Sequence, residues 1–206
     1  MARDWKKTAK KIWWFIWEDD SIASWIVNII LAFVLIKFVV FPGLGWILST
    51  DYPIVAVVSD SMEHRTSFDA WWALHENFYN NHQILKEDFR EFPFANGFNK
   101  GDIMILRGVA PENLQIGDVI VFRNSQPDPI IHRLVKRWVV EDEYHFQTKG
   151  DKNFASIPST HVNEVDIVED RVVGKAFVRV PFVGYIKIWA FELMKFIVSG
   201  IQNVLS

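Results

Sequence analysis

The longest apolar stretch of the sequence runs from Ile22 to Leu48, and Lys37 is the one charged residue within it. A helix needs about 20 predominantly apolar residues to cross the hydrocarbon core of a bilayer, so the run is long enough for one crossing. The apolar core of a cleavable secretory signal is usually only about 7–15 residues long. The sequence therefore predicts a retained transmembrane anchor over residues 22–48.

Lys37 bears on where the membrane span of this anchor ends. A lysine at the centre of a bilayer costs roughly 2.5–3.5 kcal/mol on insertion scales. Pro42, Gly43 and Gly45 follow it. We therefore expect the span to end soon after Lys37, whose amine would then extend toward the membrane surface.

Residues 1–21 form a basic, aromatic segment before the anchor. Its side chains include Arg3, Lys6, Lys7, Lys10, Lys11, Trp13, Trp14 and Trp17. We interpret it as a helix on the inner face of the membrane, and the positive-inside rule then places the N-terminus in the cytoplasm. The ten tryptophans of the chain suit a lipid–water interface, although a well-filled soluble core would also explain them.

Short β-type runs dominate the chain after residue 49. They are interrupted by turn signals such as the Gly-Asp pairs at residues 101–102, 117–118 and 150–151. The pattern predicts a mostly β catalytic domain, barrel-like or sandwich-like, over residues 49–183. The expected strands cover residues 54–58, 103–106, 119–122, 130–140, 144–148 and 172–180.

Two further segments are expected to be helical. Residues 63–99 read as a helical insertion into the β domain, with Ser67 as a candidate N-cap and a second piece over residues 84–92. This insertion would be a packing subdomain or, alternatively, a lid beside the serine described below. Residues 184–206 read as an amphipathic helix that lies in the membrane interface or spans the membrane.

Composition excludes several classes of function. The formal net charge of −3 gives no indication of nucleic-acid binding. The chain has no cysteine, so disulfides, thiol catalysis and thiolate metal sites are ruled out. The six histidines show no metal-binding spacing such as His-Glu-x-x-His. We therefore predict neither a metal nor a cofactor.

Three residues could together perform nucleophilic catalysis. Ser61 follows an apolar run that would hold it rigidly, His132 lies within an apolar strand, and Asp151 follows a glycine. A serine needs a base within hydrogen-bond reach, and an acid can orient that base. Taken singly, a histidine in a strand is more often a satisfied core or surface residue, and Asp151 is more often a turn residue.

The motifs as a set resemble those of type I signal peptidases. Ser-Asp-Ser-Met-Glu-His at 59–64 resembles the Ser-x-Ser-Met box, and residues 98–104 look like the next box. Residues 117–122 and 131–135 match the third region. Phe-Gln-Thr-Lys-Gly-Asp-Lys-Asn at 146–153 looks like the Thr-Lys-Gly-Asp-x-Asn box. The boxes occur in the family's order and, with the anchor, cover most of the chain.

The resemblance implies roles for these residues. Members of the archaeal and endoplasmic-reticulum branch carry a histidine where bacterial members carry a lysine base, and here that residue is His132. Ser61 would be the nucleophile, His132 the general base, and Asp151 the acid that supports His132. The Ser61 backbone N–H, with the Ser59 hydroxyl, would line an oxyanion hole, although Ser59 could equally be a structural serine. An archaeal source is expected.

Two departures from the family pattern bear on the site. Asp60 stands where many relatives have glycine, and we expect its side chain to face water. Many relatives also carry a second aspartate after the Gly-Asp pair, whereas residues 154–160 contain no acid. This absence leaves Asp151 as the one carboxylate that the motif supplies.

The resemblance implies a membrane-bound serine endopeptidase that removes N-terminal signal peptides from exported preproteins after small residues. Its expected partners are preprotein signal peptides and membrane lipid, and its expected place is the cell membrane with the catalytic domain outside the cytoplasm. Apolar pockets near Val57, Val58 and the His132 strand could select small residues. One alternative is a catalytically inactive scaffold or accessory subunit. Another is a self-cleaving peptidase of the repressor type, although that class typically uses a lysine base.

Overall fold

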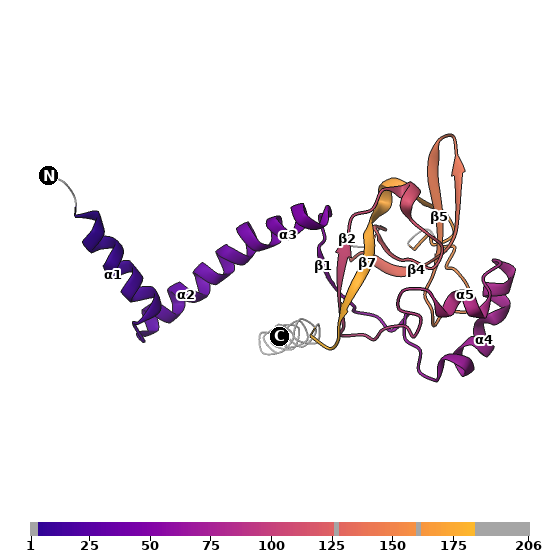
Figure 1. Cartoon of the computed structure of the whole chain (residues 1–206), viewed down its shortest axis with the longest axis horizontal. Coiled ribbons are helices and arrows are strands. Elements are labelled where there is room, and N and C mark those ends of the chain that lie inside the picture. The colour runs from indigo at the N-terminus through magenta and orange to yellow at the C-terminus, as the bar shows by residue number, and fades with distance from the viewer. Residues whose placement is uncertain (1–3, 126–127, 160–161, 184–206) are drawn as a thin grey trace, which may run out of the picture. The chain divides into compact units, whose positions relative to one another are not determined.

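The computed structural model describes residues 4–125, 128–159 and 162–183. The chain forms two compact units that divide between Ile47 and Leu48, and each is considered by itself (Figure 1). The helix expected over residues 184–206 lies outside the described residues.

The first unit is wholly helical. It consists of α1 (Trp5–Trp17), α2 (Ile22–Leu35), a π-helical turn η1 (Ile36–Val40) and α3 (Phe41–Leu48). From α2 to α3 the helix is unbroken over Ile22–Leu48, which corresponds to about 40 Å at 1.5 Å per residue. It is long and apolar enough to cross a membrane, and only 6% of its most apolar window is buried within the protein.

The helix continues past Lys37, the residue soon after which we expect the membrane span to end. The π-helical turn holds Lys37, and the helix continues through Pro42 to Leu48. A proline in a helix cannot donate a hydrogen bond and clashes with the carbonyl four residues earlier. Here the N–H of Phe41 bonds to the carbonyl of Ile36, five residues back. This wider turn lets the backbone accommodate the proline without ending the helix.

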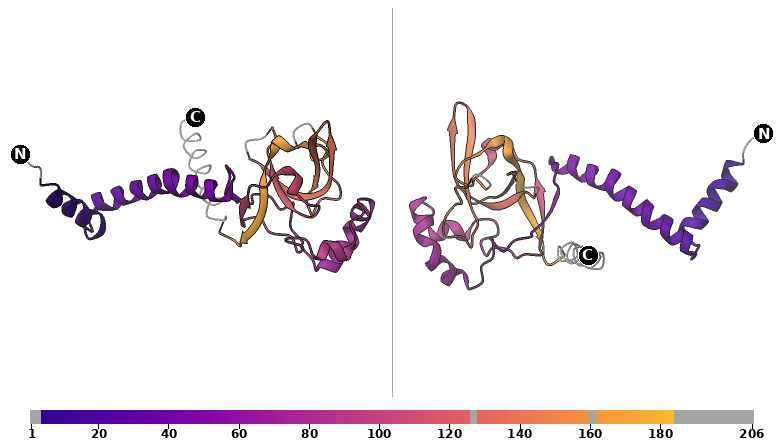
Figure 2. Two further views of the ribbon diagram at one scale, coloured as in Figure 1. Left: turned by 45° about the horizontal axis from the view of Figure 1, so that its top comes forward. Right: turned by 180° about the vertical axis from the view of Figure 1, so that it is seen from behind.

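The second unit is built on a seven-stranded antiparallel sheet that curls into a half-barrel (Figures 1 and 2). The mostly β domain expected from the sequence is thus confirmed. The strand order is β1-β2-β7-β3-β4-β5-β6. The strands are β1 (Ile54–Ala56), β2 (Ile103–Arg107), β3 (Val119–Phe122), β4 (Ile130–Val140), β5 (Glu143–Lys149), β6 (Ile167–Val168) and β7 (Val172–Val180).

Strand β3 is buried on both faces because it lies between two hydrophobic clusters. Val119 and Val121 pack with one cluster, which includes Met62 and Met104. The alternate residues of β3 pack with a second cluster that includes Phe146. This two-sided burial explains why the strand reads as an uninterrupted apolar run.

The predicted Gly-Asp turns precede β2 and β3. Gly101 and Gly117 have φ angles of +89° and +96°, a region that favours glycine. Asp102 accepts a hydrogen bond from a backbone N–H three residues earlier, at 2.8 Å, and Asp118 does the same at 3.0 Å. Short 3₁₀ turns at η2 (Pro111–Asn113) and η3 (Glu169–Arg171) complete the connections.

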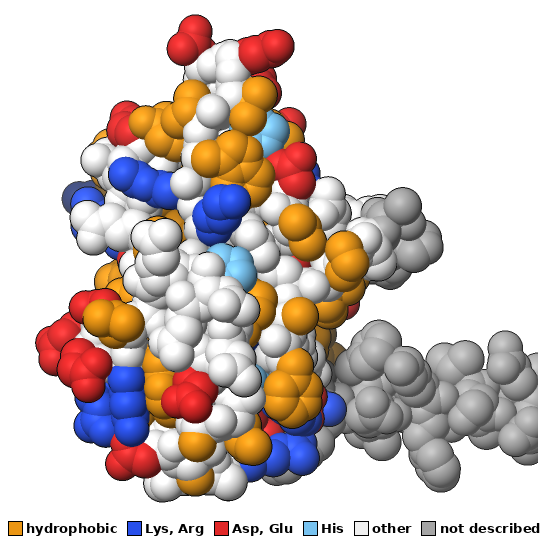
Figure 3. Space-filling view, turned by 90° about the vertical axis from the view of Figure 1, so that its right-hand side faces the viewer, with side chains coloured by type: hydrophobic (Ala, Val, Ile, Leu, Met, Phe, Trp, Pro, Cys, Tyr) orange, Lys and Arg blue, Asp and Glu red, His pale blue; other side chains and the backbone are white. Residues whose placement is uncertain are grey.

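Strands β4 and β5 form a long hairpin that projects from the half-barrel (Figure 1). The turn contains Glu141 and Asp142, both with positive φ, and Glu143 opens β5. Acidic side chains accordingly gather at this tip in the space-filling view (Figure 3). Elsewhere on that face, basic, acidic and hydrophobic side chains are interspersed.

The segment between β1 and β2 contains helices, as predicted. They are α4 (Phe68–Asn81) and α5 (Lys86–Arg90), which is shorter than the piece expected over residues 84–92. Both pack through a cluster of rings: Trp71 and Tyr79 of α4 contact Phe89 of α5 at centroid distances of 5.0 and 4.9 Å. Val135 of β4 belongs to the same cluster, so the insertion is packed onto the sheet.

His75 of α4 gives this subdomain an expected sensitivity to acid. Burial, and then the positive charge of Lys149, lower the pKa of His75 to about 4, whereas in the unfolded chain histidine titrates near its usual value of about 6.5. The unfolded state therefore binds more protons between these pH values, and the free energy of unfolding falls as pH falls through that window. We predict that His75→Phe loses less stability than the parent between pH 6.5 and pH 4.

The measurement is thermal or denaturant unfolding of the full chain in detergent at several pH values. His82→Phe, a more exposed histidine of the same segment, is the matched control and should follow the parent. Equal pH slopes for the parent and His75→Phe would contradict a buried, neutral His75.

Candidate active site

The loop that carries Ser61 is anchored on both sides. Before it, the buried Val57 extends β1 by donating its N–H to the carbonyl of Asp102 at 2.8 Å. After it, Met62 is 1% exposed and fills the core. Gly97 lies against this loop with φ +67°, and a Cβ there would come within 2.3 Å of the Met62 carbonyl oxygen. Ser61 is thus held between two fixed points and cannot drift from the sheet.

His132 faces Ser61 from strand β4. It pairs with Ile120 of β3 in the sheet register and is 5% exposed. Its Nε2 lies 2.8 Å from the Ser61 Oγ, which is within the reach that a general base requires. Gly150 lies close to both residues, because a Cβ there would come within 2.9 Å of His132 Nε2 and 3.0 Å of the Ser61 carbonyl oxygen. The structure therefore brings together Ser61 and His132 as predicted from the sequence.

The second nitrogen of His132 bonds to Glu164, a residue that the sequence analysis did not select. His132 Nδ1 contacts Glu164 Oε1, and Glu164 is fully buried. The Thr148 hydroxyl also donates to Oε1, at 3.3 Å, and the Ile157 N–H donates to Oε2 at 2.8 Å. Each carboxylate oxygen thus has a fixed partner, and the carboxylate is aimed at the imidazole.

Asp151, which we expected to support His132, bonds to other residues. Arg133 donates to both of its oxygens, Nε to Oδ1 at 2.9 Å and a terminal nitrogen to Oδ2 at 2.7 Å. His64 Nε2 lies 3.1 Å from Oδ2, and the Tyr79 hydroxyl lies 3.3 Å from Oδ1. The sequence did not reveal these partners because they come from distant segments. Glu164 lies beside His132, at the position where we expected Asp151.

The Asp151–Arg133 pair is fully buried. Burial alone would raise the pKa of the Asp151 carboxyl, but the Arg133 charge and hydrogen bonds from His64 and Arg133 hold that pKa well below its usual range. Arg133 also donates to the carbonyl oxygens of Pro93, Gly117 and Phe94 at 2.9–3.0 Å. The pair is therefore a fully hydrogen-bonded junction, as a buried charge requires.

Lys149 is a second buried cation near the site. Burial, followed by the nearby Arg133 charge, lowers its pKa to about 8 although Asp151 and Glu164 act in the opposite direction. Its amine donates to three backbone carbonyl oxygens, those of Gly150, Asp151 and Asn153, at 3.0, 3.2 and 2.7 Å. This arrangement assigns Lys149 to holding the loop that follows β5.

Ser59 and Asp60 lie on the rim of the site. The Ser59 Oγ is 3.1 Å from the Ser61 Oγ. The Asp60 side chain is 43% exposed and pairs with Arg65 at 2.6 Å and with Lys152. The hydrogen bond from Lys152, with the charges of both cations, lowers the pKa of Asp60. The expectation that Asp60 faces water is confirmed, so its charge is balanced away from the reacting atoms.

A hollow of about 380 Å³ opens beside Ser61 and His132. Its lining residues include Ala56, Val58, Ile130 and Ile157. Val58 lines it as expected, whereas Val57 is 2% exposed and packs in the core. Among the described residues, no group of three or more His, Asp or Glu side chains is placed to hold a metal ion.

The chain is similar to catalytic subunits of fungal signal peptidase complexes. No protein-family model matches it. The signal peptidase complex catalytic subunit sec11 of Neurospora crassa is 26% identical over 173 residues, covering 81% of each chain. The subunit SEC11 of Fusarium vanettenii is 27% identical over 174 residues, 82% of each chain. That of Pyricularia oryzae is 30% identical over 114 residues, 52% of this chain and 66% of the relative.

These relatives are fungal, so they give no support to the expected archaeal source. The first two extend along 81% and 82% of this chain. Together with the sequence boxes and the half-barrel, they establish that the chain belongs to the type I signal peptidase family, in the branch of endoplasmic-reticulum and archaeal members.

Proposed function

We propose that this chain is a membrane-bound serine endopeptidase that cleaves N-terminal signal peptides from preproteins, with Ser61, His132 and Glu164 as its reacting and orienting groups. The observation that carries the proposal is the 2.8 Å hydrogen bond between Ser61 Oγ and His132 Nε2. A serine hydroxyl is a weak nucleophile without such a base. The substrate class follows from the relatives, which are catalytic subunits of signal peptidase complexes.

In the proposed reaction, Ser61 Oγ attacks the carbonyl carbon of the scissile peptide bond while His132 Nε2 accepts the hydroxyl proton. His132 then gives this proton to the leaving amine, which departs as the new N-terminus of the mature protein. A water molecule next gives a proton to His132 and attacks the carbonyl carbon of the Ser61 ester. His132 returns that proton to Ser61 Oγ as the ester bond breaks, which restores the serine hydroxyl and releases the signal peptide as a carboxylate. Glu164 keeps the Nδ1–H of His132 in place and stabilises the imidazolium formed in both steps.

Negative charge develops on the substrate carbonyl oxygen during each attack. Backbone N–H groups and hydroxyls aimed at that oxygen lower the barrier. We assign this role to the Ser61 N–H and the Ser59 hydroxyl, which lies 3.1 Å from the nucleophilic oxygen. The salt bridges that draw Asp60 outward keep its carboxylate from opposing that charge.

The substrate would lie in the hollow beside Ser61. The small apolar side chains Ala56 and Val58 and the β4 residue Ile130 line this space, and a shallow apolar surface suits small residues before the scissile bond. We further propose that the helix Ile22–Leu48 anchors the enzyme in the bilayer, with the N-terminus in the cytoplasm and the β unit on the opposite side. Since the relatives are named as subunits of a complex, accessory subunits are part of this proposal.

Removal of the nucleophile or the base tests the proposal most simply. We predict that Ser61→Ala and His132→Ala each slow preprotein cleavage by at least about 10³-fold, because the members of such a unit act together. Ser59→Ala should cost about 10–10³-fold if its hydroxyl stabilises the oxyanion. Ser67→Ala is the matched control, because this serine is exposed and makes no side-chain cap bond.

Cleavage is measured with purified, membrane-reconstituted protein and a radiolabelled preprotein. A Ser61→Ala variant that cleaves as fast as the parent would refute the assignment of the nucleophile. A folded parent that cleaves no preprotein would favour a non-catalytic scaffold.

Replacing Glu164 should mainly affect the reaction rate, whereas replacing Asp151 should mainly affect stability. Glu164→Gln should lower kcat by about 10²–10⁴-fold with little change in unfolding temperature, because the imidazole loses its orienting charge. Asp151→Asn should lower the free energy of unfolding by about 3–5 kcal/mol, because Arg133 is left buried without its carboxylate. Its activity per folded molecule should stay much closer to that of the parent.

Both variants are compared by kcat per folded molecule and by thermal unfolding in the same detergent. The opposite result, a folded but inactive Asp151→Asn beside an active Glu164→Gln, would return the supporting role to Asp151.

The orientation of the anchor can be tested because the chain has no cysteine. Single cysteines introduced as Thr8→Cys in α1 and Ser67→Cys before α4 provide unique labels in the two units. We predict that a membrane-impermeant maleimide added to sealed vesicles labels only one of the two, and that the other reacts after detergent is added. Labelling of both from the same side would contradict a single crossing.

A further inference from the structure

Helix α1 presents two chemically different sides. At 100° per residue, Lys6, Lys7, Lys10 and Lys11 fall within an arc of about 140°, which Trp14 and Trp17 share. The remaining arc carries mainly apolar residues, listed from the N-terminal end as Trp5, Ala9, Ile12, Trp13, Phe15 and Ile16. No residue of α1 is buried, and Trp5 and Trp13 are 69% and 62% exposed. The described part of the protein thus leaves both sides of the helix without cover.

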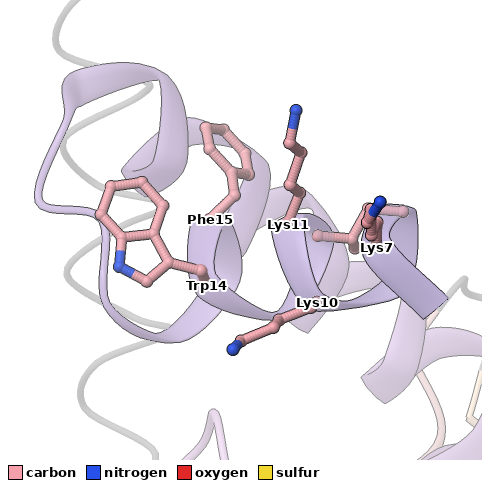
Figure 4. A pocket seen from close by; sticks show the side chains of 6 residues that line it. Lys7, Lys10, Lys11, Trp14 and Phe15 are labelled. Atoms are coloured by element: carbon pink, nitrogen blue, oxygen red, sulfur yellow. The ribbon is translucent and has the colours of Figure 1, made fainter.

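The lysines and aromatic rings of α1 lie beside one another. Lys7, Lys10 and Lys11 border the same hollow as Trp14 and Phe15. Figure 4 shows the lysine side chains extending away from the ribbon, with the two rings one turn further along. Lysine stems of this kind can lie along apolar material while their amines reach a polar layer. Tryptophan rings are enriched at the same boundary between lipid and water.

The end of α1 is fastened to the start of α2. The Ser24 hydroxyl donates to the Phe15 carbonyl at 2.5 Å, and the Asn28 amide donates to the Ile16 carbonyl at 2.9 Å. Between the helices, Asp19 accepts hydrogen bonds from the N–H and the hydroxyl of Ser21, both at 3.0 Å. The two helices accordingly meet at a bend in both views (Figures 1 and 2). Because of this clamp, α1 does not continue the axis of the apolar helix.

We propose that α1 is a lipid-docking helix, whose lysines bind the anionic phosphate groups of the cytoplasmic leaflet while its apolar side enters the head-group boundary. This proposal rests on the membrane anchoring proposed above. A helix with a basic side and an aromatic, apolar side is suited to the plane of a membrane interface, and the cytoplasmic leaflet is negatively charged. The clamp to α2 would keep α1 at that surface and fix how deep the anchor begins.

We assign the binding partner of α1 as a lipid surface and not an acidic protein, because α1 is close in the chain to the apolar helix that would cross the membrane. Only four residues separate the end of α1 from the start of α2, which is almost fully apolar. Any bilayer that surrounds α2 therefore reaches α1 as well. Lys7 is partly neutralised by Asp4 at 2.8 Å. Lys6, Lys10 and Lys11 therefore carry most of the expected attraction.

The experiment uses the full chain in nanodiscs of phosphatidylcholine alone or with about one third phosphatidylglycerol. Ala9→Cys, on the apolar side of α1, carries an environment-sensitive fluorophore, which brominated lipids quench when it lies at the acyl boundary. We expect stronger quenching in the anionic discs, which weakens as salt rises because exposed charges are screened. The triple variant Lys6→Gln, Lys10→Gln, Lys11→Gln should lower the docking equilibrium constant by about fivefold per lysine.

The matched control removes three lysines from the β unit, the exposed Lys100→Gln and Lys136→Gln and the half-buried Lys86→Gln, and should leave quenching unchanged. Replacement of the α1 lysines by arginine should preserve it. Quenching that is equal in neutral and anionic discs, or unaffected by the α1 triple variant, would overturn the proposal. Docking seen in native membranes but not in discs of purified chain would instead assign the helix to a protein partner.

Preprotein cleavage in the same discs separates this proposal from the enzymatic one. Normal docking of α1 without cleavage contradicts the proposed enzyme alone. Normal cleavage with a lipid-independent α1 contradicts lipid docking alone.

Discussion

The buried pair between Asp151 and Arg133 is the interaction on which the catalytic unit depends. Arg133 extends from β4, next to His132, and reaches the backbone carbonyls of Pro93, Phe94 and Gly117. Through Asp151 it is linked to the loop after β5. That loop in turn receives the Trp71 indole N–H, which donates to the Asp151 carbonyl oxygen at 3.1 Å. One ion pair therefore ties together the sheet, the helical insertion and the loop beside Ser61.

A buried charge pair is retained at a cost, since two ions must leave water. Here the cost is offset because almost every hydrogen-bonding position of the pair has a named partner, and Arg133 also lies over the Phe89 ring at 4.6 Å. The two buried carboxylates therefore differ in their contacts. Asp151 bonds to Arg133 and fixes the loop after β5 to the sheet, whereas Glu164 contacts the His132 ring. The helical insertion contributes to this arrangement, because Tyr79 and Trp71 both donate hydrogen bonds to Asp151.

Much of the fold could be predicted from the sequence because its signals are local. Strands β3, β4 and β7 begin and end where their β-branched runs do, and the apolar helix has the expected bounds of 22–48. Strand β6 has two residues, too few to give a periodic signal.

The continuation of the apolar helix past Lys37 depends on a π-helical turn, whose backbone hydrogen bonds cannot be read from the residue composition. Ser61 and His132 were found because each ends or interrupts an apolar run within a recognisable box. Asp151 lies inside a motif box, whereas Glu164 lies outside every box. The motifs therefore point to Asp151, and the contact between the imidazole and Glu164 follows only from the tertiary structure.

The proposed reaction requires His132 to act as a base on the side-chain oxygen of Ser61. The most direct measurement is the rate at which iodoacetamide alkylates Ser61→Cys in the full chain, where the introduced thiol is unique. A thiol beside a histidine forms a reactive thiolate more readily than an isolated one. We expect the alkylation of Ser61→Cys near neutral pH to be faster than that of Ser67→Cys. Adding His132→Gln should return it to the slower rate. Equal rates for the two cysteines, or no effect of His132→Gln, would contradict this role of His132.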